Sequence, residues 1–303
     1  MLLPLFFVTA LLDDRLVLEG RGKHIVFISG DEEYRSEEAL PALARILNKH
    51  HGFKCTVLYA IDPKDGTINP DIRDNIPGLE TLESADLMVI ATRFRNLPDS
   101  QMQHIVRYLD RNGPIVALRT ATHAFAFDQG AYQKYSWNSK EWPGGFGRQI
   151  LGETWIRHHG KHAVQSTRGL VKDAKHPILR GVREIWGPAD VYEAHPTSDA
   201  LVLVEGQVLV GMNPQDAPLE GKSTMPVAWT RTINNRRVFT TTMGGATDLV
   251  NDGVRRMIIN ACFWALAKES RIKPTANIAF VLEYKPTTFK FGGYIRGMKP
   301  DDR

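Results

Sequence analysis

Short apolar runs alternate with amphipathic segments through the first 120 residues of the chain. Residues 24–29, 53–60, 85–92 and 114–120 are apolar runs with the length of buried strands. Leucine and alanine recur at helical spacing over 40–47, and 98–111 has the pattern of a second helix, with Asp99 capping its start and Gly113 closing its end. This order of elements predicts a doubly wound sheet.

The second half of the chain has a less regular pattern. Residues 125–147 are rich in aromatic residues, glycine and proline and predict a long ordered loop over the site. Residues 162–168 and 200–212 alternate as strands. The stretch 227–242 predicts a hairpin that turns at Asn234 and Asn235, because asparagine tolerates positive φ. Residues 253–267 predict an amphipathic helix that covers the sheet.

These patterns divide the chain into three parts. Residues 1–22 form a signal-like or extended segment, 23–270 an α/β domain, and 271–303 an extended tail. The opening block MLLPLFFVTALL is too short to span a bilayer and lacks the basic region and cleavage site of a complete signal peptide. We expect an export signal or its remnant, hence an exported or periplasmic protein with no membrane contact in its mature form. A cytoplasmic location is the alternative.

Composition narrows the range of partners. The chain has 303 residues, 24% of them charged, and a net charge of +4. Its basic residues are scattered, so we expect a small-molecule partner and no nucleic acid, while a homo-oligomer stays open. Cys55 and Cys262 lie in apolar contexts and are predicted to be buried, which favours neither a disulfide framework nor a thiolate metal site.

Charged residues follow the predicted strands. Ligands of doubly wound sheets bind beyond the carboxyl ends of the strands, where residues 31–35, 93–95 and 119–123 fall. Glu37 and Glu38 belong to the helix start, where carboxylates favour the dipole. The candidates for chemistry in the first acidic stretch are therefore Asp31, Glu32 and Arg35.

Histidines are the second concentration of functional groups. His158, His159, His162 and His176 are close in sequence, and His123 follows the fourth apolar run. Each alone is more often structural, but the cluster indicates that at least one takes part in proton transfer or metal binding. No G-x-S-x-G, P-loop or G-x-G-x-x-G motif is present, and the acids of the first turn would repel a phosphate.

The segments ALRTATHAF, GRQILGETWIRHHGKH, HPILRGV and MPVAWTRTINNRRVFTTTMGG resemble, in this order, the trehalose-utilisation (ThuA-like) family over residues 23–268. The stretch GDEEYRSEEALPALARIL is similar to the exported branch of planctomycete-type bacteria. The resemblance implies a class I glutamine amidotransferase-like fold: a three-layer, flavodoxin-like, mostly parallel sheet with helices on both faces. Arg119 stands where an amidotransferase carries its cysteine, and a guanidinium is no nucleophile, which excludes a glutaminase.

The resemblance also implies a role in the breakdown of disaccharides, through pathways that oxidise sugars to 3-keto forms. It implies a carbohydrate partner and a divalent metal, zinc or a similar ion, as the candidate cofactor. His123, His158, His159 and His176 match the family pattern. Many members carry a histidine where this chain has Arg119.

Together these features favour a carbohydrate enzyme. Asp31 or Glu32 would be the general base, paired with His123 or His158, while arginines bind a ketone or hydroxyl oxygen. The expected catalytic residues are Asp31, Glu32, Arg35, Arg119, His123 and His158. Four aromatic residues are candidates for stacking on sugar rings, although we expect at least half of them to be packing residues: Tyr34, Trp137, Trp142 and Trp155.

Two alternatives stay open. A metal-dependent hydrolase would use His158, His159 or His162 as metal ligands, together with a carboxylate such as Glu153 or Asp31. A non-catalytic sugar-binding protein would keep the fold without the chemistry.

Overall fold

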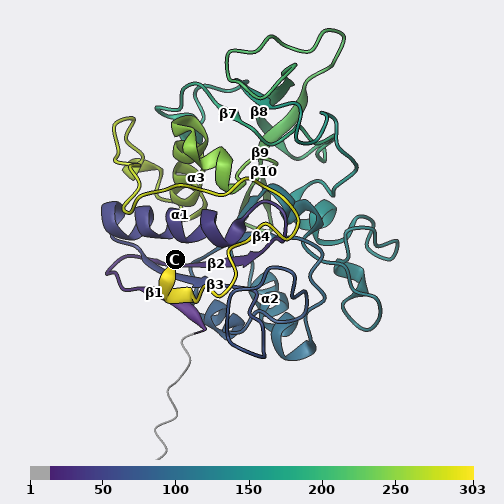
Figure 1. Cartoon of the computed structure of the whole chain (residues 1–303), viewed down its shortest axis with the longest axis vertical. Coiled ribbons are helices and arrows are strands. Elements are labelled where there is room, and N and C mark those ends of the chain that lie inside the picture. Colours follow the sequence, from purple (N-terminus) through teal and green to yellow (C-terminus); the bar gives the residue numbers. More distant parts are fainter. Residues whose placement is uncertain (1–13) are drawn as a thin grey trace, which may run out of the picture.

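A computed structural model describes residues 14–303 (Figure 1). A ten-stranded sheet runs in the order β1-β3-β2-β4-β5-β10-β9-β8-β6-β7. Its strands are β1 (Arg15–Leu18), β2 (His24–Gly30), β3 (Lys54–Leu58), β4 (Leu87–Thr92), β5 (Ile115–Leu118), β6 (Thr167–Val171), β7 (Trp186–Gly187), β8 (Leu201–Val208), β9 (Met225–Ile233) and β10 (Arg236–Thr241). The α-helices are α1 (Ser36–His51), α2 (Asp99–Asp110) and α3 (Asp252–Ala265).

Short helical turns complete the elements. They are η1 (Leu79–Ser84), η2 (Arg119–His123), η3 (Gln133–Tyr135), the π-turn η4 (Gly147–Leu151), η5 (Pro177–Leu179), η6 (Ala246–Val250), η7 (Glu269–Arg271) and η8 (Pro300–Asp302).

The central strands have helices on both faces, as their continuous apolar runs predict. Ile25 and Phe27 of β2 share one core with residues of α1 and α3, whereas Val26 and Ile28 share a second core with residues of α2. Accordingly, α1 and α3 lie on one side of these strands and α2 on the other (Figure 1). Successive side chains of a strand point to opposite faces, so a strand covered on both must be apolar throughout.

The expectation of a mostly parallel sheet needs correction. Strands β3, β2, β4, β5 and β10 are parallel neighbours. The hairpin of β9 and β10 then reverses the direction, and β8, β6 and β7 continue antiparallel, while β1 pairs antiparallel with β3 at the other edge. The mixed sheet arises because no α-helix lies between β6 and β10 to make a parallel crossover. A two-residue turn joins β9 to β10, and longer loops join the strands before them.

The predicted hairpin is confirmed, with φ of 48° at Asn234 and 67° at Asn235. The predicted strand over 162–168 is wrong in its first part, because only 167 and 168 belong to β6. Residues 162–166 form a turn in which the Lys161 carbonyl accepts hydrogen bonds from the amides of Val164 and Gln165.

Both predicted ends of α2 differ in detail. Asp99 is the first helical residue and does not cap the helix; its carboxylate instead accepts a hydrogen bond from Tyr132. At the other end Asn112 takes the left-handed conformation, with φ of 57°. The amide of Gly113 then donates to the carbonyl of Tyr108 at 3.1 Å, which closes the helix.

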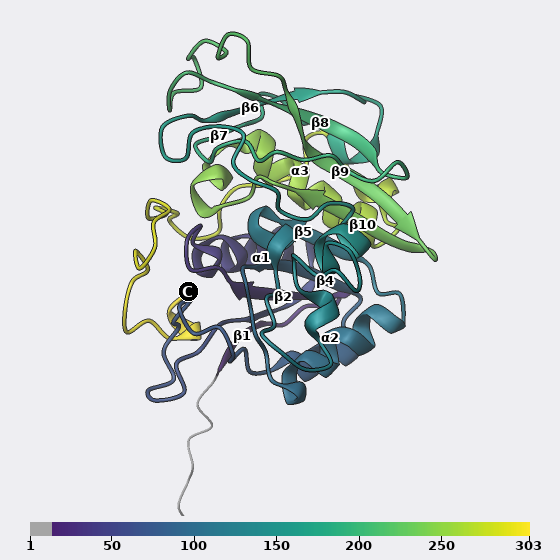
Figure 2. The same ribbon diagram turned by 90° about the vertical axis from the view of Figure 1, so that its right-hand side faces the viewer.

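The predicted C-terminal tail, residues 271–303, runs past α1 (yellow in Figures 1 and 2). Its residues 272–299 contain no strand or helix, and η8 then lies against β1. The amide and hydroxyl of Thr287 donate to the Glu38 carboxylate at 2.8 and 2.9 Å. Further along, the amide of Ile68 donates to Met298 at 2.8 Å.

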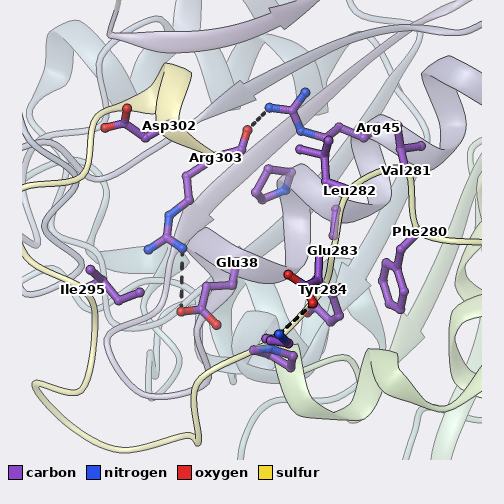
Figure 3. A pocket seen from close by; sticks show the side chains of 14 residues that line it. Glu38, Arg45, Phe280, Val281, Leu282, Glu283, Tyr284, Ile295, Asp302 and Arg303 are labelled. Carbon is purple, nitrogen blue, oxygen red and sulfur yellow. Dashed lines mark hydrogen bonds and ion pairs between the residues drawn. The ribbon is translucent and has the colours of Figure 1, made fainter.

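The tail and α1 line an open pocket of about 180 Å³ (Figure 3). The Arg303 guanidinium lies 3.7 Å from the Glu38 carboxylate, and Arg45 of α1 donates to the Arg303 carbonyl. These contacts hold the tail against α1, which begins directly after the acidic residues of the 31–35 loop.

Among residues 14–303, no helix is both long and apolar enough to cross a membrane. The apolar block of the expected export signal lies in the first thirteen residues, outside the part that the structure describes. The rest of the predicted 1–22 segment contains β1, which pairs with β3 and so belongs to the sheet.

Candidate active site

Three loops meet beyond the carboxyl ends of β2, β4 and β5. The amide of Arg93 donates to Gly30 at 2.9 Å, and the amide of Phe94 donates to His123 at 2.9 Å. These bonds join residues 31–35, 93–95 and η2 into one surface. The sequence placed functional groups at this edge, and the edge does collect them.

Asp31 is the acceptor that shapes the first loop. One carboxylate oxygen accepts hydrogen bonds from the amides of Glu33 (2.8 Å) and Tyr34 (3.1 Å), and the other accepts from the Thr120 hydroxyl at 2.8 Å. The side chain is almost fully buried. Because this carboxylate is buried and accepts three hydrogen bonds from its own surroundings, its position favours holding the loop over the expected role of general base.

Glu32 is held between two arginines. One oxygen pairs with Arg93 and the other with Arg95 at 2.7 Å. Arg95 also donates to the carbonyls of Pro70 and Ile72, and burial lowers its pKa to about 10. Glu32, which was expected to be a base, is therefore corrected to an ion-pair partner of Arg93 and Arg95.

Arg35 faces away from the other candidates. It has a left-handed backbone (φ 60°), is fully buried, and donates to the carbonyls of Glu32 and Lys290. Its Nε lies 3.7 Å from the Glu37 carboxylate. Arg35 thus connects the loop to the tail and cannot bind a substrate oxygen in this position.

Arg119 lies at the centre of the site but has no free donor group facing solvent. It follows β5 with φ of 44° and is 1% exposed. The guanidinium donates to the carbonyls of Asp190 and Thr242 at 2.7 Å, to the Tyr34 hydroxyl at 2.7 Å and to the Asp190 carboxylate at 3.0 Å. These bonds fix the positions of Asp190 and Tyr34 and engage the guanidinium inside the protein.

Asp190 is a buried carboxylate that contacts two histidines. Its Oδ2 accepts a hydrogen bond from His158 Nδ1 at 2.7 Å, and its Oδ1 lies 3.4 Å from His162 Nδ1. Burial acts to raise the pKa of Asp190, but the hydrogen bonds from His158 and His162 and the charge of Arg119 hold it well below its ordinary value. A fixed anion therefore lies behind two imidazoles.

The chain places His158 beside Asp190 by strand-like pairing. Residues 157–160 run antiparallel to 190–193, with the amide of Glu193 donating to Arg157 at 3.0 Å. The His158 side chain remains 39% exposed. With Nδ1–H donated to Asp190, the Nε2 of His158 carries the lone pair that a base or a metal ligand needs.

His162 bridges two carboxylates. Its Nε2 lies 3.3 Å from Glu33, in addition to the contact of Nδ1 with Asp190. The hydrogen bond with Asp190 raises the pKa of His162 in spite of burial. Burial also raises the pKa of Glu33, more than the neighbouring charge of Arg93 lowers it. Both shifts favour the protonated form of the group concerned, so the pair is suited to share a proton.

His123 lies behind the exposed groups. It is 2% exposed, and burial, helped by the charges of Arg93 and Arg119, lowers its pKa well below 6.5. Its ring packs 4.9 Å from Phe94 and 5.4 Å from Trp155. Its only side-chain hydrogen-bond partner among the described residues is Thr122, at 3.2 Å, so the expected pairing of His123 with Asp31 or Glu32 is not found.

The predicted stacking residues separate into two groups. Trp155 lies 5.9 Å from His158 and 5.7 Å from Trp137, and both tryptophans are partly exposed. Trp142 instead packs against Tyr135, away from these loops. Tyr34 is buried under Arg119, so only two of the four remain candidates for contact with a ligand.

Two further histidines are not part of the site. His159 Nε2 lies 2.8 Å from the Ser223 carbonyl, whereas the adjacent His158 contacts Asp190. His176 accepts a hydrogen bond from the amide of Ile178 and packs on Trp264. The expectation that His159 joins a metal site is therefore corrected.

His158, His162 and Asp190 together fit a divalent cation. Their nearest ligand atoms all lie within 4.8 Å of one another. Two imidazoles and a carboxylate are a donor set typical of zinc and similar ions, and Glu33 lies beside the set. No cofactor is established, and the charge of Arg119 next to Asp190 opposes a cation.

Sequence reasoning missed Asp190 and Glu33. Asp190 lies in GPADVYEAHP, which contains no motif, and it reaches the site only through its pairing with 157–160. Glu33 belongs to the acidic stretch but could not be distinguished there from Asp31 and Glu32.

The fold and the site together define an α/β protein with a histidine–carboxylate cluster beyond the parallel strands. A family model, described as trehalose utilisation (ThuA), matches residues 24–265, so the chain belongs to the trehalose utilisation family. This confirms the predicted family and supports a carbohydrate-related role, while the exported branch and the amidotransferase-like superfamily stay predictions.

Solved structures share the fold. A ThuA-like protein from Parabacteroides merdae is similar with a TM-score of 0.56 and 14% identity, over 81% of this chain and 90% of that one. A ThuA-like protein from Bacteroides uniformis has a TM-score of 0.54 and 16% identity, over 84% and 96%. No curated protein sequence matches the chain.

Proposed function

We propose that the chain is an enzyme of carbohydrate breakdown that cleaves a disaccharide or 3-keto-glycoside, with His158 as general base. The observation that carries the proposal is the contact of His158 Nδ1 with the buried Asp190 at 2.7 Å, combined with the exposure of the ring. A buried carboxylate orients such an imidazole, with Nε2 directed away from the carboxylate. The family's association with trehalose utilisation supports the substrate class.

The site supplies both halves of an elimination. In a 3-keto-glycoside the carbon beside the ketone carries an acidic proton, which Nε2 of His158 removes. The electron pair forms a double bond to the anomeric carbon, whose bond to the glycosidic oxygen breaks. His162, protonated between Glu33 and Asp190, donates a proton to the leaving oxygen. The roles expected of Asp31 and Glu32 thereby pass to His158 and His162.

Glutaminase activity is disfavoured by the residue that follows β5 and by the burial of both cysteines. The turn after β5 has the left-handed residue expected of a nucleophile position, but that residue is Arg119. Cys55 and Cys262 are fully buried, and burial raises the pKa of Cys262 to about 12. We infer an amidotransferase-like fold that no longer carries a nucleophilic cysteine.

Turnover of trehalose, sucrose and their 3-keto derivatives tests the proposal. His158→Asn is expected to lower kcat about 10²-fold or more, and Asp190→Asn to do the same by releasing the imidazole. His159→Gln is the matched control, because that ring faces Ser223. Full activity of His158→Asn would contradict the proposal, and sugar binding without turnover by the wild type would indicate a binding protein.

A metal-dependent hydrolase is the second candidate, favoured by the donor set of His158, His162 and Asp190. A bound cation would lower the pKa of a water molecule and provide a hydroxide nucleophile. The test is metal analysis of protein prepared without a histidine tag. Stoichiometric zinc, manganese or iron that is lost in His162→Asn but kept in His159→Gln would support it; absence of metal from the wild type would remove it.

A further inference from the structure

The C-terminal tail, which lies beyond the family match, forms one wall of the site. The amide of Lys290 donates to the backbone carbonyl of Glu33 at 3.0 Å, and the carbonyl of Lys290 accepts from the Arg35 side chain at 2.8 Å. The adjacent Phe289 is 6% exposed; its ring stacks on Tyr34 at 5.3 Å and lies 5.4 Å from His162. The tail is thus bonded to the loop that carries Glu33.

Phe291 follows this anchored segment and has a different environment. Its side chain is 56% exposed. The Arg93 guanidinium lies 5.0 Å from its ring centroid and 4.5 Å from that of Phe94. Arg93 is itself paired with Glu32 and lies 3.6 Å from Glu33. The exposed ring is therefore held by cation–π contact at a defined place beside the carboxylates.

Phe291 is the exposed end of an aromatic belt, which we define as Phe291, Phe94, Trp137 and Trp155. Arg93 joins the first two, the rings of Phe94 and Trp137 are 5.8 Å apart, and Trp137 and Trp155 are 5.7 Å apart. The belt ends beside His158. It connects the proposed base with an apolar surface supplied by the tail.

We propose that Phe291 is a specificity-determining residue that stacks on one ring of a disaccharide substrate; this rests on the proposed function. A pyranose offers an apolar C–H face to an aromatic ring, while its hydroxyls need polar partners. Phe291 provides the aromatic ring for the C–H face, and Arg93 and Glu33 beside it provide polar partners for the hydroxyls. Glu33 connects the two parts of the site directly, because it lies 3.6 Å from Arg93 and 3.3 Å from His162. A disaccharide with one ring on Phe291 can therefore place its second ring toward His162 and His158.

Titration calorimetry of the full chain with trehalose, sucrose and their 3-keto derivatives tests this assignment. Phe291→Ala is expected to weaken binding about five- to tenfold, and Phe291→Tyr to restore it within about twofold. Leu282→Ala is the matched control, because Leu282 is an exposed tail residue (58%) that has no contact with the belt. Where turnover is measurable, KM should rise in Phe291→Ala while kcat stays nearly constant.

The outcomes separate this inference from the proposed function. Equal affinity of wild type and Phe291→Ala, or no binding of any of these sugars by the wild type, would overturn the assignment of Phe291. Weaker binding by Phe291→Ala with no turnover by the wild type would support the assignment while contradicting the proposed enzyme. A loss of affinity in Leu282→Ala equal to that in Phe291→Ala would show a general effect of the tail and would also overturn it.

Discussion

Single side chains in this site differ in function although they share a residue type. Asp31 and Asp190 are both buried aspartates, but Asp31 accepts bonds from its own loop, whereas Asp190 contacts two histidines. Arg35 and Arg119 are both buried arginines with positive φ, and only Arg119 reaches Asp190. The partners of each group, and not its type, determine its chemistry.

At the residue scale, His123 predicts a dependence of stability on pH. Burial lowers its pKa in the folded state below 6.5, so the unfolded state binds a proton first as the pH falls. The stabilisation is full above about pH 6.5 and is lost progressively below it, by up to about 1.4 kcal/mol per pH unit. His123→Asn should flatten this slope in urea unfolding between pH 7 and 5.

The control for that experiment is His195→Asn. His195 is 63% exposed, so its ring is solvated in both states and its removal should leave the slope unchanged. A slope as steep in His123→Asn as in the wild type would show that other buried histidines cause it.

At the scale of elements, the end of α2 shows how packing adds to a local signal. Gly113 was predicted to close the helix, but the left-handed residue is Asn112. Glycine is needed because a Cβ at 113 would lie 2.3 Å from the ring of Tyr108, which is buried and donates to Pro114. The pattern located the helix end, and the contact with the ring requires the glycine.

Gly113→Ala is therefore expected to destabilise the protein by about 2–3 kcal/mol, because the buried ring must shift. Gly130→Ala provides the comparison: its φ is +89°, but no atom lies within 4 Å of the added Cβ. Its cost should be about 1 kcal/mol, from backbone strain alone. Urea unfolding measures both, and equal losses would contradict the steric argument.

At the scale of the whole molecule, the tail connects α3 to the far edge of the sheet and contributes to the site (Figure 2). Its hydrogen bonds to Glu38 and to the loop of Glu33 join it to the same segment that carries the first candidates for chemistry. Stability of the tail and binding of a ligand are therefore expected to be coupled.

Glu38→Ala should release the tail, because Thr287 loses both of its hydrogen bonds and Arg303 its partner. We expect faster proteolytic cleavage between 285 and 299, measured by mass spectrometry under limited digestion. Glu283→Ala is the control, since that side chain is 76% exposed and pairs only with Lys285. Identical cleavage of the two variants would show that Glu38 does not hold the tail.

The sequence by itself determined the order of the central strands and helices, the hairpin at Asn234 and Asn235, and the edge of the sheet where polar groups collect. These follow from periodicity and turn residues, which act over short stretches of chain. It also identified His158 and His162 as candidates, but placed the base on Asp31 or Glu32 and expected His159 among the ligands.

Only the tertiary structure decided which of these groups are held by partners inside the protein and which stay accessible. Hydrogen bonds from Thr120 and from Arg95 occupy Asp31 and Glu32, and the pairing of 157–160 with 190–193 brings Asp190 to His158. The antiparallel half of the sheet and the wall formed by the tail were decided in the same way. The physical reason is that burial and hydrogen-bond partners depend on residues far apart in the chain, which no local pattern specifies.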